Sequence, residues 1–207
     1  MKFVQRVGSA AAAVLGRQSR LVNALRPAYE RGLNALALGN GIPWSINGAQ
    51  CRVDARYRSQ LGQHYDVPVA DFLRPRVRPG QVCFDVGANV GAWVLQFAHW
   101  VGSSGRVIAF EPNPASLSVL RAHVDMSGFA DRVTFLQAAA GASNEAAIFH
   151  AAGTDGMSRI GHPNELIQSQ SLQIPASVIT LSQYCRSEQI RPDWILIDVE
   201  GYEGNVL

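Results

Sequence analysis

The 207-residue sequence predicts an α/β domain with a mostly parallel sheet and helices on both of its faces. Short apolar runs at 81–86 and 106–110 are each followed by a helical apolar pattern. A further run at 194–198 is apolar until its last residue, which is typical of a parallel strand buried on both faces. Strands that alternate with helices in this way favour βαβ units.

The segment 81–101 carries the strongest signal. Its strand pattern breaks into the turn Gly87-Ala88-Asn89-Val90-Gly91, and a helical pattern then continues to residue 101. A strand, a glycine-bearing turn and a helix form the nucleotide-binding crossover of open α/β sheets. Gly87 and Gly91 have no Cβ and would let a ligand approach the backbone closely. Asp85, at the carboxyl end of the strand, would direct its carboxylate into the ligand crevice.

The turn does not have the G-x-G-x-x-G spacing of dinucleotide sites, which argues against a nicotinamide-dependent oxidoreductase. An acidic residue just before the first glycine suits a ligand with positive charge near the turn better than it suits a pyrophosphate. S-adenosylmethionine, which has an ammonium and a sulfonium group, is such a ligand. The alternative is a structural turn that binds nothing.

Glu111 directly follows the predicted strand 106–110. It lies about twenty residues past the turn, where a carboxylate can accept hydrogen bonds from both hydroxyls of a ribose. A surface carboxylate is the alternative. A helix at 116–126 and a strand at 133–136 come next. The residues that follow this strand, beginning with Gln137 and Ala138, would either leave room for an adenine ring or only allow tight packing.

The remaining segments are predicted from their apolar patterns and turn residues. We expect a helix at 1–38, a linker, a small hairpin at 44–53 and a helix at 61–73. Beyond the central strands we expect strands at 146–150 and 177–180 around a long polar loop at 153–173, and a helix at 182–189. The chain therefore divides into an N-terminal basic helical segment with its linker, 1–41, and a main domain, 42–207.

Charge is distributed unevenly along the chain. Residues 1–80 contain twelve Lys or Arg and four Asp or Glu, a net charge of +8. Residues 81–207 contain six Lys or Arg and twelve Asp or Glu, a net charge of −6, so the whole chain has a net charge of +2. The basic first part suggests an anionic partner. The predicted N-terminal helix would pack on the domain or a partner, lie on a membrane surface as a basic amphipathic helix, or serve as a targeting segment.

The three cysteines are far apart and show neither a disulfide framework nor a metal-binding spacing, so we expect a reducing, cytoplasmic location. Peripheral contact with the inner face of the membrane would use the basic helix. A nucleic-acid site would need a basic stripe with aromatic residues, which the sequence does not show. We therefore expect no nucleic-acid partner. The sequence gives no oligomeric state.

Three motifs together resemble the FkbM family of S-adenosylmethionine-dependent methyltransferases: D-V-G-A-N-V-G at 85–91, F-E-P-N-P at 110–114 and I-D-V-E-G-Y-E at 197–203. Tyr65-Asp66 stands where the family often has Tyr-Glu. The resemblance covers about 42–207 and implies a Rossmann-like fold of the class I methyltransferases. It also implies S-adenosylmethionine as cofactor and O-methyl transfer to a hydroxyl of a sugar, a glycolipid or polysaccharide unit, or a polyketide-like metabolite. The implied cofactor-binding residues are Asp85, Gly87, Ala88, Asn89 and Gly91 for the methionine part, and Glu111, with Pro112 beside it, for the ribose.

The chain departs from the family pattern in two places. Leu196 stands where the family usually has lysine. If that lysine serves catalysis, the chain would be a catalytically inactive cofactor-binding or scaffold protein; if it only pairs with a nearby acid, little is lost. Family members also continue past this point, so we expect a domain that lacks its C-terminal strands, with strand 194–198 as an exposed apolar edge.

Methyl transfer from a sulfonium to a hydroxyl is an in-line displacement in which positioning supplies much of the rate. The hydroxyl also needs a base, and the expected catalytic residues are Asp198 and Glu200. His150 and His162 are alternatives on the predicted substrate side. Two carboxylates without a third clear ligand are weak grounds for a metal, and we expect none. The expected partner is a small-molecule or glycan hydroxyl acceptor; a nucleic-acid methyltransferase is a less favoured alternative.

Overall fold

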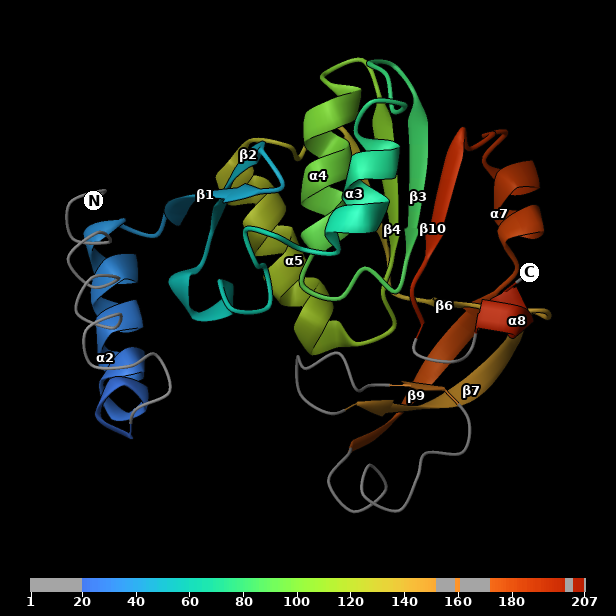
Figure 1. Ribbon diagram of the computed structural model, residues 1–207. Helices are drawn as coiled ribbons and strands as arrows, with labels where there is room; N and C mark the ends of the chain where they lie inside the picture. The colour runs from blue at the N-terminus through green and yellow to red at the C-terminus, as the bar shows by residue number, and fades with distance from the viewer. Residues whose placement is uncertain (1–19, 152–158, 161–171, 200–202, 207) are drawn as a thin grey trace.

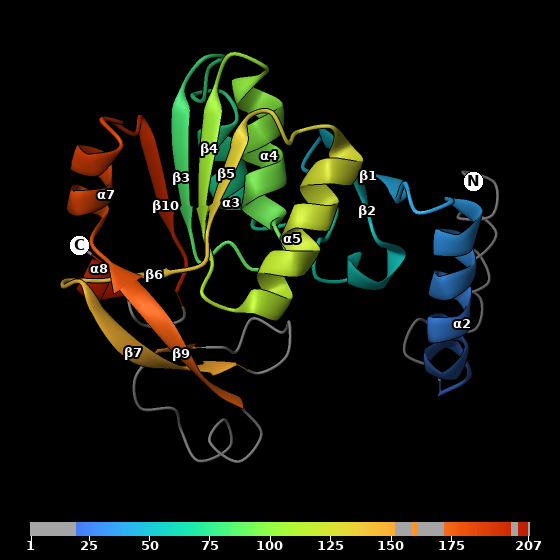
Figure 2. The ribbon, with the colours of Figure 1, turned by 180° about the vertical axis from the view of Figure 1, so that it is seen from behind.

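The computed structural model describes residues 20–151, 159–160, 172–199 and 203–206. At its centre is a parallel four-stranded sheet. Its strand order is β10-β3-β4-β5, and Figure 2 shows the four strands side by side. The sequence predicts all four of these strands, which are β3 (Val82–Val86), β4 (Arg106–Phe110), β5 (Val133–Leu136) and β10 (Trp194–Ile197).

Helices cover both faces of this sheet, as predicted (Figure 1). On one face α4 (Ala92–Val101) and α5 (Pro114–Ser127) belong to the larger core cluster, with Cys83 and Val107 of the strands. On the other face Phe84, Val86, Ile108 and Phe110 form a second core with α7 (Leu181–Ser187). Alternate residues of β3 and β4 thus face opposite layers, which is the doubly covered, Rossmann-like α/β arrangement.

Local sequence explains where α5 begins and ends. The Asn113 side chain accepts a hydrogen bond from the Ala115 amide and caps the helix, and Pro114 follows at its first position. Gly128, at φ 71°, ends it in the left-handed conformation.

The N-terminal part consists of α2 (Arg20–Leu36), the hairpin of β1 (Ile42–Ile46) and β2 (Ala49–Val53), the short 3-10 helix Ala55–Tyr57, and α3 (Val67–Leu73). The predicted hairpin is confirmed. The helix predicted at 61–73 is wrong in its first half, because Asn47 bonds to both the amide and the carbonyl of Tyr65. These bonds hold the segment before α3 as a loop. Residues 1–19, which include the start of the predicted N-terminal helix, lie outside the described residues.

A second sheet lies below the carboxyl ends of the parallel strands (Figure 1). Its order is β6-β9-β7-β8, with β7 and β9 antiparallel over seven residue pairs. The strands are β6 (Ala139–Ala140), β7 (Glu145–Ala151), β8 (Arg159–Ile160) and β9 (Leu172–Ile179). The sequence predicts β7 and only the end of β9, and it does not predict a separate sheet. Most of the predicted loop 153–173 lies outside the described residues, although β8 and the start of β9 fall within its range.

β10 is an edge strand of the described parallel sheet, as expected, and its Ile195 is exposed. The short helix α8 (Glu203–Val206) follows it, and Val206 packs into the second core. Within the described part of the chain, no helix is long and apolar enough to cross a membrane.

Candidate functional site

The carboxyl ends of β3, β4, β5 and β10 meet at one edge of the parallel sheet, where open α/β folds bind their ligands. Asp85 lies one residue before the end of β3, Glu111 directly follows β4, and Asp198 directly follows β10. The sequence predicts each of these three positions. The sheet therefore brings together carboxylates that are far apart in the chain.

The glycine-bearing turn is fixed to the end of β4. The amides of Gly87 and Ala88 both donate to the carbonyl of Phe110, each at 3.0 Å. The amide of Asn89, a residue at φ 45°, donates to the Glu111 carboxylate at 2.7 Å. The turn and Glu111 consequently form one hydrogen-bonded unit.

Glu111 is buried, and each of its two carboxylate oxygens accepts one backbone amide. Oε2 accepts from Asn89 and Oε1 accepts from Asn113, both at 2.7 Å. Loss of hydration raises the pKa of Glu111 to about 7, although the two amides act in the opposite direction. A carboxylate has about four acceptor positions, so two remain for a ligand such as the hydroxyls of a ribose.

Asp85 is only 1% exposed, and among the described residues its Oδ2 has no hydrogen-bond partner. Burial raises the pKa of Asp85 to about 8, helped by the negative charges of Asp198 and Glu111 and opposed by the Val94 amide in the first turn of α4. A buried acidic oxygen without a partner is costly unless a donor or cation reaches it. Asp85 is therefore suited to a positively charged ligand.

The two glycines of the turn have a role that the sequence does not predict. A Cβ on Gly87 would clash with the carbonyl oxygen of Asp198, and a Cβ on Gly91 would lie 2.5 Å from Leu120 Cδ1. Protein atoms thus occupy the space beside both glycines. Their missing Cβ atoms first serve packing of the turn against β10 and α5, and contact of Gly87 and Gly91 with a cofactor stays a prediction.

Asp198 is exposed at the end of β10, and its amide donates to the Val86 carbonyl at 2.9 Å. Although the side chain stays exposed, nearby protein atoms remove part of its hydration, which raises its pKa. The negative charges of Glu203 and Asp66 act in the same direction. Asp66, at the start of α3, thus lies within electrostatic range of Asp198. Glu200, the second predicted catalytic residue, lies outside the described residues.

The other predicted residues surround Glu111. Pro112 is half-buried between Glu111 and Asn113. The Glu111 amide donates to the Leu136 carbonyl at 3.0 Å, so the exposed Gln137 and the buried Ala138 follow directly beside it. An adenine-binding role for these two residues stays a prediction.

Of the two alternative bases, the structure describes only His150. His150 is buried in β7 of the second sheet, and His162 lies outside the described residues. In the part of the chain that the structure describes, no group of three His, Cys, Asp or Glu side chains could hold a metal ion.

Comparison with known proteins decides the family. The model of the methyltransferase FkbM domain matches residues 85–207, more than half of the chain. The chain belongs to the FkbM methyltransferase family. A curated relative, the 31-O-demethyl-FK506 methyltransferase FkbM of Streptomyces tacrolimicus, is 47% identical over 57 residues, which is 28% of this chain and 22% of the relative. The matched part therefore spans about a fifth of that relative's length.

Two solved structures show partial similarity. An S-adenosylmethionine-dependent O-methyltransferase from Thermotoga maritima is 22% identical at a TM-score of 0.35, covering 47% of this chain and 40% of its own. A methyltransferase of the same cofactor class from Aquifex aeolicus is 21% identical at a TM-score of 0.32, covering 40% and 41%. The fold assignment rests on the strand order and layers of this chain.

S-adenosylmethionine is the cofactor of this family of methyltransferases, and the residues at the site suit it. Glu111 keeps acceptor positions after binding two amides, as a ligand with hydroxyl groups requires. Asp85 Oδ2, which has no partner among the described residues, matches a ligand that carries an ammonium and a sulfonium. The carboxylates of the described site thus complement the charge of the cofactor.

Two residues of the site are not predicted from the sequence. Asn113 both caps α5 and donates its amide to Glu111, a double role that its position before Pro114 could have indicated. His123 on α5 is fully buried and lies 2.9 Å, through Nδ1, from the carbonyl of Val90 in the turn. Only the fold brings His123 to the turn, 33 residues away in sequence.

Proposed function

We propose that this protein is an S-adenosylmethionine-dependent O-methyltransferase that acts on a hydroxyl of a sugar, a glycolipid or polysaccharide unit, or a polyketide-like metabolite. One observation carries the proposal. Asp85, Glu111 and the glycine-bearing turn lie together at the carboxyl edge of the parallel sheet, in a chain that belongs to a methyltransferase family. The name of the Streptomyces relative, a 31-O-demethyl-FK506 methyltransferase, supports oxygen as the methyl acceptor.

The bound cofactor would supply a methyl group attached to a sulfonium, which is electrophilic at carbon. We assign Asp85 and the turn residues Gly87, Ala88, Asn89 and Gly91 to its methionine part. Glu111, with Pro112 beside it, would hold the ribose, and Gln137 and Ala138 would line the adenine.

Asp198 is the proposed general base. It would accept the proton of the acceptor hydroxyl as the oxygen attacks, so that no free alkoxide has to form. Its raised pKa makes it a stronger base than an ordinary aspartate. Glu200 is the second candidate for this role.

A catalytically inactive cofactor-binding protein is the second candidate function, favoured by one observation. Leu196 of β10 is paired in register with Asp85 of β3. A lysine at this position, as the family usually has, would stand beside the buried carboxylate. Leucine leaves Asp85 without that cation, so turnover has to be tested separately from binding.

The first experiment is calorimetric titration of the protein with S-adenosylmethionine and, separately, with NADH. The variants Asp85→Ala and Glu111→Ala are titrated alongside, and Asp125→Ala, an exposed carboxylate on α5, is the matched control. We expect saturable binding of S-adenosylmethionine alone, weakened at least about tenfold in the two site variants, as the loss of a charged hydrogen-bond partner predicts. Binding of NADH, or equal affinity in all variants, would overturn the assignment of the site.

The second experiment separates the two candidate functions. Protein that binds the cofactor is incubated with radiolabelled S-adenosylmethionine and a panel of neutral polyols, glycolipids and macrolide alcohols. Label transfer that falls at least about a hundredfold in Asp198→Asn, with cofactor affinity unchanged, supports the enzyme and its base. Tight binding without transfer to any acceptor favours the inactive protein.

A further inference from the structure

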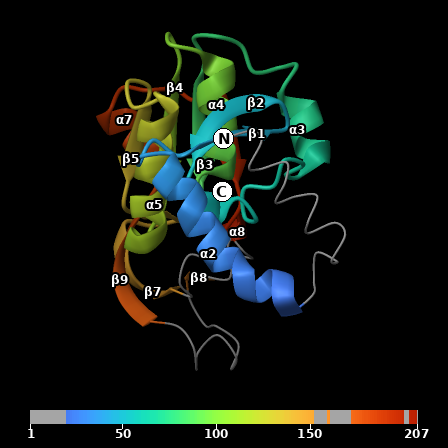
Figure 3. The same cartoon turned by 90° about the vertical axis from the view of Figure 1, so that its left-hand side faces the viewer.

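The Asn47 side chain holds the segment that leads into α3. Its Oδ1 accepts the Tyr65 amide at 3.2 Å, and its Nδ2 donates to the Tyr65 carbonyl at 2.5 Å and to Oε1 of the fully buried Gln96 at 2.9 Å. The Tyr65 ring packs edge-on against Trp93 of α4, with ring centroids 5.9 Å apart. Figure 3 shows the β1–β2 hairpin reaching across α4 towards α3. The residue after Tyr65 is therefore fixed relative to the helix that follows the glycine-bearing turn.

That residue is Asp66, whose carboxylate does not serve its own helix. It occupies the N-cap of α3 in the left-handed conformation, at φ 41°, which few residues other than glycine, asparagine and aspartate adopt. An aspartate at an N-cap usually accepts a helix amide, but the Asp66 side chain makes no such capping bond to the described helix. It is exposed, and its negative charge acts on Asp198 at the end of β10. The fold thus brings an acid of α3 to the proposed base.

The negative charge continues from Asp198 into the sheet. The charge of Asp198 acts on Asp85, whose Oδ2 is buried and has no hydrogen-bond partner among the described residues. A buried acid of this kind indicates a ligand that brings a donor or a cation. Asp85 and Glu111, both buried, lie on the side that we assign to the cofactor. Asp66 and Asp198, both exposed, are the acids that an acceptor entering from solvent would meet first.

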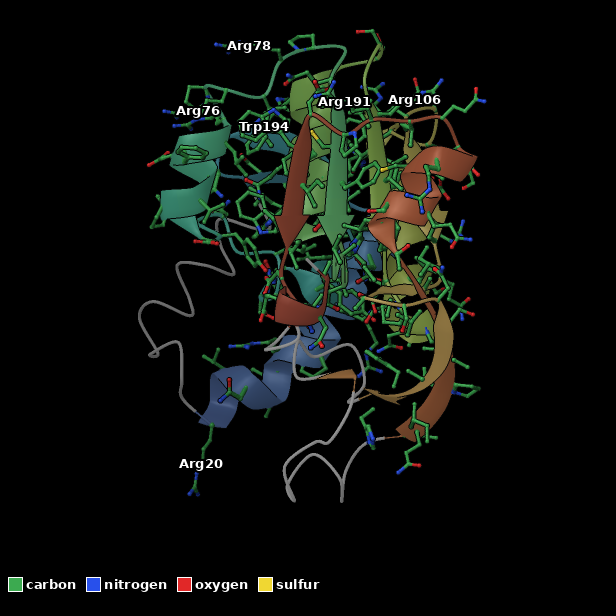
Figure 4. All side chains as sticks on the ribbon, turned by 90° about the vertical axis from the view of Figure 1, so that its right-hand side faces the viewer. Arg20, Arg76, Arg78, Arg106, Arg191 and Trp194 are labelled. Atoms are coloured by element: carbon green, nitrogen blue, oxygen red, sulfur yellow. The ribbon has the colours of Figure 1, made fainter. Side chains whose placement is uncertain are left out.

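The segments around this edge contain more acids than bases. Residues 198–203 contain one Asp, two Glu and neither Lys nor Arg. Residues 145–179, which supply β7, β8 and β9 of the second sheet, contain three Asp or Glu and one Arg, a net charge of −2. Arg78, Arg106 and Arg191 lie at the opposite end of the parallel sheet (Figure 4). An acceptor would therefore approach a negatively charged edge.

We propose that the acceptor of this site carries no negative charge. Neutral polyols and amino sugars are accepted, whereas acidic sugars and phosphorylated acceptors are rejected. A carboxylate or phosphate beside Asp66 and Asp198 would meet like charges where part of the surrounding water is displaced, which makes the repulsion stronger than in bulk water. An ammonium group would be attracted by the same charges. This inference rests on the proposed function and narrows its acceptor class by charge.

The test measures label transfer from S-adenosylmethionine to matched triplets of acceptors. Each triplet contains a neutral alcohol, its amino derivative and its carboxylate derivative, beginning with methyl glucoside, methyl glucosaminide and methyl glucuronoside. We expect kcat/KM for the carboxylate to lie at least about tenfold below that for the neutral alcohol, and kcat/KM for the amino derivative to equal or exceed the neutral value. High salt should reduce these differences, because it screens exposed charges.

The variant Asp66→Asn tests the residue to which we assign the selectivity. Asparagine also adopts the left-handed conformation, so the variant keeps the backbone of this segment. The ratio of kcat/KM between neutral and carboxylate acceptors should fall at least about threefold in Asp66→Asn. It should stay unchanged in Asp125→Asn, which makes the same change in net charge at an exposed position on α5.

The outcomes separate this inference from the proposed function. A carboxylate acceptor used as well as its neutral counterpart, or an equal ratio in wild type and Asp66→Asn, would overturn the inference and leave methyl transfer intact. Cofactor binding without transfer to any member of any triplet would overturn the proposed function, and this inference with it. Circular dichroism establishes that each variant is folded.

Discussion

Single residues outside the strand ends hold the turn in place. His123 is fully buried, contacts the edge of Tyr57, and lies 2.9 Å from the Val90 carbonyl. Burial lowers the pKa of His123, so the ring is neutral near pH 7, and its Nδ1 has to carry the hydrogen to donate to that carbonyl. The residue before Val90, Asn89, donates to Glu111, so His123 supports the geometry on which the proposed ribose site depends.

We therefore predict that His123→Leu weakens binding of S-adenosylmethionine about tenfold, because the buried Val90 carbonyl loses its donor. His123→Asn, which keeps a donor near the position of Nδ1, should restore most of the affinity. Calorimetric titration measures both variants, and hydrogen exchange of the Gly91 amide reports the turn itself. Equal affinity in wild type and His123→Leu would refute this positioning role.

Strand pairing determines what surrounds Asp85. The parallel register of β10 and β3 places Leu196 directly beside Asp85, and paired residues of neighbouring strands lie on the same face about 5 Å apart. The register also shows what changes when leucine stands at position 196, where the family usually has lysine. A lysine here would be a partner for the buried acid, and leucine does not supply that positive charge.

Leu196→Lys should accordingly lower the pKa of Asp85 by at least about one unit, because a nearby positive charge favours the carboxylate. The uncharged Leu196→Met is the control. The titration of the Asp85 carboxyl carbon by NMR measures the shift directly. If the lysine and methionine variants titrate alike, the lysine does not reach Asp85 and the proposed pairing is wrong.

Elements with a continuous local pattern are those that the sequence predicts. α4 and β4 match their predicted ranges because an unbroken apolar run or helical period defines each of them. β9 is predicted only at its end, since Pro175 and exposed polar residues interrupt its pattern and its partner β7 supplies the pairing. The strand-end carboxylates follow from strand prediction alone. The role of Asn113 follows from its place before Pro114. The role of His123 depends on a contact with the turn, 33 residues away, that no local pattern reveals.

The molecule as a whole is electrostatically polar. Figure 4 shows Arg78, Arg106 and Arg191 at the end of the sheet where the strands begin. The opposite end carries Asp85 and Glu111, both buried at the carboxyl edge. The described site thus holds two acidic groups in a dry environment, where their ionisation costs stability but favours a cationic ligand.

The free energy of unfolding should therefore fall as pH rises from 5 to 8. The folded-state pKa of Asp85 is about 8, against 3.8 ordinarily, so between these values the folded chain holds a proton that the unfolded chain has lost. A raised acid pKa lowers stability as pH increases. Glu111, at about 7 against 4.5, acts in the same direction. Urea denaturation should show wild type losing at least about 1 kcal/mol over this range.

Asp85→Asn should remove most of this pH dependence, because a neutral amide carries no charge to bury. The variant should be more stable than wild type at pH 8 and similar at pH 5, while it binds S-adenosylmethionine at least about tenfold more weakly. Asp125→Asn, at an exposed position on α5, controls for the change in net charge. A wild type whose stability is flat from pH 5 to 8 would show that Asp85 is already ionised in the folded protein. The site would then need a cation of its own, and the fit to a positively charged cofactor would lose its main support.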